Sequence, residues 1–193
     1  MKRQLLIVSA ALAALSIAAC NQKQDAKTPA DAAMPDANAA ATVPTPADEA
    51  AAPDFAMKMA DSDIFEIAAA KLAASRAMNS EVKAFAADMI KDHTKSSDDL
   101  KAAIGASGQA INLPTAVSAD KQSKLDDLAE KKGADFDKAY MENQVDAHQA
   151  ALDLLKRYAQ DGDVEPLKAF ATNTGAVVQQ HYDHAKALRD SLK

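Results

Sequence analysis

Apolar residues recur at spacings of three and four along four long segments between residues 54 and 193. This period places them on one face of a helix, and each such face needs a neighbour to cover it. The chain has few glycines, no tryptophan and little clustering of β-branched residues, so strands are not favoured. A stretch of this length is also typical of a single domain. The sequence therefore predicts one all-α domain over residues 54–193.

Turn and capping residues divide this domain into helices. We expect one helix over residues 54–78, capped by its first residue, and a second over residues 80–104, also capped by its first residue. Ser118 begins a further segment, which Gly133 interrupts, and the last helix follows the turn at residues 161–163 and is capped by the aspartate there. Short turns after the first and third segments predict antiparallel neighbours. The pattern therefore predicts an antiparallel four-helix bundle with an extra helical segment before the third long helix.

The N-terminal segment, Met1–Cys20, has the pattern of a bacterial export signal. Lys2 and Arg3 precede a short apolar run, Leu5–Ala19, that is too short for a comfortable membrane span. The end of this run, followed by Cys20, resembles the lipobox of bacterial lipoproteins. We therefore predict a signal peptide over residues 1–19 and lipidation of Cys20. An ordinary signal peptide followed by a chance cysteine is the alternative.

Residues 20–53 would then be a lipidated cysteine and a disordered tether. The segment is rich in Ala, Pro and Asp and has no aromatic residue, so it cannot bury enough apolar surface to offset its ordering entropy. Asn21 is not the aspartate that resembles an inner-membrane retention signal, which favours the outer membrane in a host with two membranes. We expect an exported cell-envelope lipoprotein, periplasmic or at the outer membrane.

Charge and motif content narrow the function classes. The formal net charge of −6 becomes −8 once Lys2 and Arg3 are removed with the signal. An acidic protein is a poor partner for nucleic acid and for anionic lipid, so the membrane contact is expected through the lipid anchor alone. Cys20 is the only cysteine, which excludes an internal disulfide and a cysteine metal site. No phosphate loop or hydrolase elbow is present, which favours a protein that is not an enzyme.

Three histidines and one glutamate lie on inward-facing stripes of four different helices: Glu66, His93, His148 and His181. Imidazole is a common ligand of transition metals, and a buried carboxylate beside it could complete a site. Glu66 precedes Asn79, in the first turn, by nearly as many positions as His93 follows it. In antiparallel helices these two side chains are therefore expected at nearly the same level.

The histidines of the third and fourth long helices, His148 and His181, are not expected at the same level. Gly162 lies in the turn between these helices, and His181 is about five positions farther from it than His148 is. This difference is an offset of about 7–8 Å along a helix. A compact ring of four ligands is therefore not expected. The di-iron signature Glu-x-x-His is also missing, because Ile90 and Val178 occupy the glutamate positions.

Two interpretations of these four residues stay open. They could form a transition-metal site, mononuclear or shared between molecules. Alternatively, His93 and Glu66 could form a buried hydrogen-bonded pair that fixes which helix faces meet. His184, one turn after His181, is expected on a solvated flank, and Asp92 is expected on a solvated acidic face of its helix.

Several sequence blocks resemble a known family, the domain-of-unknown-function 4142 family. The blocks are Phe65–Ala68, Glu81–Ala86, Met89–Thr94, Gly133–Tyr140, Asp146–His148 and the closing residues His181, Ala185 and Leu188. Members of that family are typically exported bacterial proteins with a ferritin-like helical bundle and no established biochemical role. The resemblance implies this fold and location, and it leaves the activity open. Gly175 is a departure, because the family pattern has a proline near this position.

These observations lead to two function hypotheses from different classes. The first is a non-enzymatic, lipid-anchored envelope protein that acts as a binding or interaction module, with another envelope protein as a candidate partner. The second is a metal-binding or redox ferritin-like protein that uses Glu66 and the core histidines. A purely structural envelope protein without a ligand is a third.

Overall fold

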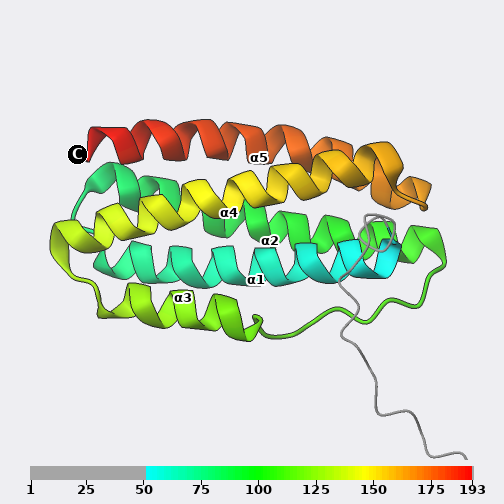
Figure 1. Cartoon of the computed structure of the whole chain (residues 1–193), viewed down its shortest axis with the longest axis horizontal. Helices are drawn as coiled ribbons and strands as arrows, with labels where there is room; N and C mark the ends of the chain where they lie inside the picture. The colour runs from blue at the N-terminus through cyan, green and yellow to red at the C-terminus, as the bar shows by residue number, and fades with distance from the viewer. Residues whose placement is uncertain (1–50, 193) are drawn as a thin grey trace, which may run out of the picture. The chain divides into compact units, whose positions relative to one another are not determined.

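A computed structural model describes residues 51–192 of the chain, which form five helices and no strand (Figure 1). The helices are α1 (Ala52–Arg76), α2 (Ser80–Ser107), α3 (Ala119–Glu130), α4 (Gly133–Asp161) and α5 (Glu165–Ser191). The all-α prediction is confirmed. The predicted signal peptide, Cys20 and all but the end of the predicted tether lie outside the described residues. Within the described range, none of the helices has the length and apolar character that crossing a membrane requires.

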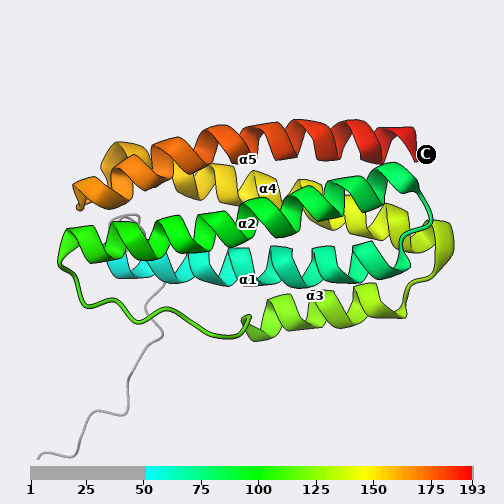
Figure 2. The same ribbon diagram turned by 180° about the vertical axis from the view of Figure 1, so that it is seen from behind.

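The four long helices pack around a common interior. α1 packs on α2, α2 on α5, α5 on α4, and α4 on α1, while α3 lies outside this ring against α1 and α4. The chain reverses direction between α1 and α2 and again between α4 and α5, as Figure 1 and the reverse view in Figure 2 show. Each long helix therefore contributes one face to the interior.

The interior consists of two apolar clusters with a polar layer between them. One cluster lies near the α1–α2 turn and includes Phe85 and Tyr140. The other lies near the α4–α5 turn, where the rings of Phe55 and Tyr158 stack with their centroids 3.8 Å apart. The buried polar side chains between the clusters come from all four long helices: Asp63, Glu66, His93, Ser96, Gln144, His148 and His181. This layer is the part of the interior that apolar packing does not explain.

The caps of α1 and α2 differ from the sequence prediction. α1 begins at Ala52 without a side-chain cap and takes Pro53 into its first turn, where the missing N–H is not needed. Asn79, not Ser80, caps α2: its side-chain oxygen accepts hydrogen bonds from the backbone N–H groups of Glu81 and Val82 at 2.7 and 3.3 Å.

The turn between α4 and α5 also differs from the prediction. Asp163 does not cap α5, because Val164 occupies the N-cap position. The Asp163 carboxylate instead accepts a hydrogen bond from the Tyr158 hydroxyl at 2.9 Å. Gly162 is required here, because a Cβ at this position would lie 2.5 Å from the Tyr158 carbonyl oxygen. The turn is therefore packed tightly against the last turn of α4.

A buried aspartate joins the two halves of the fold. Asp137, in the first turns of α4, is 2% exposed. Its carboxylate accepts hydrogen bonds from the backbone N–H of Met78 at 3.0 Å and of Asn79 at 2.8 Å. These N–H groups belong to the α1–α2 turn, so one side chain satisfies two donors there and fixes the turn against α4.

Candidate metal centre

Three histidines meet in the polar layer between the two apolar clusters. His93 comes from α2, His148 from α4 and His181 from α5, and all three are buried. Their ring centroids are 5.6 Å apart for His93 and His148, 5.7 Å for His93 and His181, and 5.5 Å for His148 and His181. One nitrogen of each ring lies within 4.8 Å of the other two. The structure therefore joins three of the four predicted ligands in one cluster.

The predicted offset between His148 and His181 is wrong for two reasons. The loop between α4 and α5 spans residues 162–164, so its centre is Asp163 and not Gly162. Counted from Asp163, His181 is farther than His148 by only about three positions, or about 4.5 Å along a helix. Side chains lean toward the N-terminus of their own helix, so His148 leans away from this loop and His181 leans toward it. The two imidazoles consequently meet at one level.

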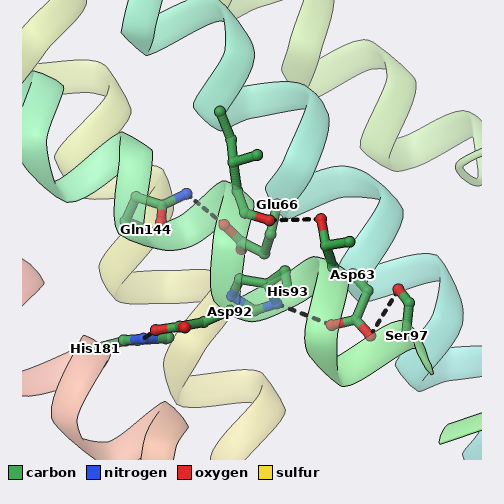
Figure 3. Close-up of polar contacts among 9 residues, drawn as sticks. Asp63, Glu66, Asp92, His93, Ser97, Gln144 and His181 are labelled. Atoms are coloured by element: carbon green, nitrogen blue, oxygen red, sulfur yellow. Dashed lines mark hydrogen bonds and ion pairs between the residues drawn. The ribbon is translucent and has the colours of Figure 1, made fainter. Parts of the chain in front are cut away.

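One nitrogen of each imidazole, here called the outer nitrogen, has a hydrogen-bond partner, and the other is called the inner nitrogen. His93 Nδ1 lies 2.8 Å from Asp63 Oδ1 on α1, and His181 Nε2 lies 3.1 Å from Asp92 Oδ2 on α2; Figure 3 shows both pairs. His148 Nδ1 lies 2.8 Å from the backbone carbonyl oxygen of Gln144, one turn earlier on α4. An acceptor at this nitrogen fixes both the ring orientation and the tautomer, and leaves the other nitrogen with a free lone pair.

The inner nitrogens have no partner. His93 Nε2, His148 Nε2 and His181 Nδ1 are buried, and none has a hydrogen bond to another residue of the described chain. Buried polar atoms without partners are rare in native proteins, and three imidazole nitrogens of this kind in one cluster make a candidate set of metal ligands. In metal-binding proteins, the histidine nitrogen that does not bind the metal usually donates its N–H to a carboxylate or a backbone carbonyl, as the outer nitrogens can here. The residues present therefore fit a transition-metal ion.

Burial controls the charge of the cluster. It lowers the pKa of His148 to about 3 and that of His181 to about 4, so both rings are neutral at neutral pH. Burial acts in the same direction on His93, but the hydrogen bond to Asp63 and the charge of Glu66 outweigh it and raise the pKa of His93. An incoming cation would therefore compete with a proton mainly at His93.

Glu66 lies next to the cluster but is not part of it. Its carboxylate oxygen Oε2 accepts a hydrogen bond from Gln144 Nε2 at 2.6 Å (Figure 3), and it is not among the atoms that lie within 4.8 Å of one another. Burial raises the pKa of the Glu66 carboxyl. The side chain therefore belongs to the polar layer beside the cluster, where its other oxygen, Oε1, is buried and has no hydrogen-bond partner in the described chain.

The interpretation of a His93–Glu66 hydrogen bond is wrong, because Asp63 occupies that position. The centre of the α1–α2 loop is Met78. Asp63 and His93 are equally far from Met78 along the chain, whereas Glu66 is nearer to it by almost one helical turn. In antiparallel helices Asp63 is therefore the residue at the level of His93.

Sequence reasoning missed the residues that hold the histidines. Asp63 and Gln144 were not singled out, although Asp63 lies three residues before Glu66 on the same helix face. Asp92, expected on a solvated face, instead pairs with His181 while its side chain stays 28% exposed. One sequence signal could have identified Asp63: it and His93 are equally far along the chain from Met78, the centre of the α1–α2 loop. Counting from Asn79 instead makes the two distances unequal, so the match is missed.

These features define a class: an all-α protein with a buried cluster of three histidines whose outer nitrogens are fixed. The chain belongs to the family described as domain of unknown function DUF4142, whose model matches residues 34–188. This match confirms the resemblance inferred from the sequence blocks. A comparison with curated proteins found no match.

Several solved structures have a similar fold. A DUF305 fragment from Deinococcus radiodurans is 13% identical, with 72% of this chain and 95% of that chain covered and a TM-score of 0.63. CopM in its Cu(II)-bound form is 15% identical, with 74% and 98% covered and a TM-score of 0.63. A putative secreted DUF305 protein from Streptomyces coelicolor is 15% identical, with 74% and 94% covered and a TM-score of 0.60. At these identities the likeness concerns the fold alone.

Proposed function

We propose that this chain is an exported protein that binds one transition-metal ion among His93, His148 and His181. The observation that carries the proposal is that three buried histidines bring ring nitrogens within 4.8 Å of one another and that each ring keeps one nitrogen without a hydrogen-bond partner in the described chain. Each ring is held from behind by Asp63, Asp92 or the Gln144 carbonyl. The orientations of the three rings are therefore fixed before an ion arrives, which lowers the cost of binding.

The donor set favours copper. Imidazole nitrogen suits Cu, Zn, Ni and Fe, and among divalent ions of the first row Cu(II) binds most tightly to a given set of donors. The ion bound to CopM, Cu(II), agrees with this choice. Glu66 as a further ligand, as the sequence suggested, stays a prediction. The function proposed is binding of the ion, without a catalysed reaction.

The finer description of the fold is part of the same proposal. We take the four long helices as an antiparallel, ferritin-like four-helix bundle, with α3 as the extra helical segment. The closed order of packing among α1, α2, α5 and α4 supports this description. Three histidines on separate helices, with two of the nearby carboxylates hydrogen-bonded to them, favour a mononuclear ion over a di-iron centre.

Metal titration tests the proposal. Purified full-length protein without a polyhistidine tag, stripped with a chelator, is expected to bind one equivalent of Cu(II) per chain. Saturation at about 1,000 times Kd should raise the melting temperature by about 10 °C, because the ion binds only the folded state. The His184→Ala variant, which removes the exposed fourth histidine, should bind equally well. Sub-stoichiometric metal and an unchanged melting temperature with Cu, Zn, Ni and Fe would overturn the proposal.

The lipid anchor is a separate proposal that rests on the lipobox-like end of the signal sequence and on Cys20. It would hold the metal-binding domain at the cell envelope on a spacer rich in proline. The Cys20→Ala variant is expected to lose incorporation of radiolabelled palmitate and to leave the membrane fraction when expressed in a bacterial host. Palmitate labelling equal to that of the unaltered chain would contradict the anchor. An envelope protein as partner stays a prediction.

A further inference from the structure

A cavity of about 200 Å³ lies between α2 and α5 and reaches the histidine cluster. His93 and His181 line its inner part, and Ser96, Val177 and Val178 line it further along the two helices. Of these residues, Val177 is 41% exposed, so the cavity extends from the surface to two of the three histidines. The cavity is smaller than a typical pocket for a drug-sized molecule, which limits its occupant to a small ligand.

The Ser96 hydroxyl is the unexplained polar group of this cavity. The residue is 8% exposed, its Oγ is fully buried, and it has no hydrogen-bond partner among residues 51–192. Serine within a helix commonly bonds the carbonyl one turn back, as Ser75 and Ser191 do near their helix ends. Ser96 is one turn after His93, on the same face of α2. Ser96 therefore lines the same cavity one turn from His93, and its hydroxyl is available to a ligand there.

We propose that the ion bound by the three histidines keeps one open coordination position toward this cavity. The position holds an exchangeable, small monodentate ligand, which is water at rest and a small anion when one is supplied, and Ser96 Oγ hydrogen-bonds that ligand. This inference rests on the proposed function. Three protein ligands with a fourth position open to solvent are the usual arrangement of an exchangeable metal site, whereas structural sites use four protein ligands.

The charged residues around the cavity are consistent with this assignment. Asp92 is paired with His181, and Lys95 is paired with Asp99, so both acidic groups that line the cavity already have a partner. Neither is needed as a fourth ligand. The charge of the bound cation is then the main attraction for an anion, because Lys95, the cationic side chain among the lining residues, is already paired with Asp99.

Azide binding to the copper-loaded full chain tests the inference. Cu(II)-loaded protein, freed from excess metal, is expected to develop an azide-to-copper charge-transfer band that saturates with azide concentration. The Ser96→Ala variant should still bind one Cu(II), but its affinity for azide should fall about tenfold, because a hydrogen bond to a charged ligand is lost. The Ser62→Ala variant is the matched control, since Ser62 lines a different cavity formed by α1, α3 and α4.

The outcomes separate the two proposals. If the unaltered chain binds no stoichiometric copper, the proposed function fails and this inference fails with it. If copper binds but azide leaves its spectrum unchanged while the metal is retained, the fourth position is closed and this inference alone is overturned. If azide binds with equal affinity to the unaltered chain and to Ser96→Ala, the assignment of Ser96 is overturned.

Discussion

The His148→Ala variant is expected to bind Cu(II) at least about a hundredfold more weakly than the unaltered chain. Replacement of a second-layer partner of a metal ligand already costs about 10–100-fold in affinity, and loss of a ligand costs more. His148 is the most suitable position because it is 1% exposed and its ring is neutral at neutral pH. Competition titration against a copper chelator of known affinity measures the change.

Two further variants make this experiment specific. Asp63→Asn keeps the size of the residue that holds His93 but removes its charge, and it should give an intermediate loss of about tenfold. His184→Ala removes an exposed histidine from α5 and should leave the affinity unchanged. Equal copper affinity in His148→Ala and in the unaltered chain would contradict the proposed site. Circular dichroism of each metal-free variant checks that a loss does not arise from unfolding.

The Asp137→Ala variant is expected to lower the free energy of unfolding by about 3 kcal/mol. The substitution removes two hydrogen bonds from a buried carboxylate and leaves the N–H groups of Met78 and Asn79 without their acceptor. The effect is expected on the whole fold, because these bonds fix the α1–α2 turn against α4. Urea unfolding of the metal-free protein, followed by circular dichroism, measures the loss.

Asp135→Ala is the matched control for this variant. Asp135 is exposed in the first turn of α4, two residues before Asp137, so its loss removes a similar charge near the helix N-terminus without a buried bond. Its expected cost is about 0.5 kcal/mol. Equal stability of the two variants would show that the Asp137 carboxylate does not hold the turn.

The helices could be predicted from the sequence because each long segment has an apolar stripe and its ends are marked by turn residues. The caps were harder to predict, since neighbouring polar residues compete for the same N–H groups. Asn79 and Ser80 are both good capping residues, and their order alone does not decide between them. Asp163 is a capping type that instead accepts the Tyr158 hydroxyl, a contact with the preceding helix that no local rule predicts.

The histidine cluster could be predicted in part. Spacing placed His93, His148 and His181 on inward-facing stripes, and the structure brings all three together. Their relative depth depended on the exact centre of each loop, because any shift of that centre changes the offset between two antiparallel helices by twice as much. The lean of the side chains adds a further displacement of similar size. Asp63 could have been found by a count from the true centre of its loop, but Asp92 could not be distinguished from other acidic residues until the packing of the helices was known.

An anomalous difference map from crystals of the copper-loaded protein, measured at the copper absorption edge, tests the central claim most directly. We expect one strong peak per chain at about 2.0 Å from each of three atoms: His93 Nε2, His148 Nε2 and His181 Nδ1. Asp63 and Asp92 should remain hydrogen-bonded to the outer nitrogens of their histidines. Ordered copper found only elsewhere on the chain, with no peak among these three nitrogens, would contradict the account.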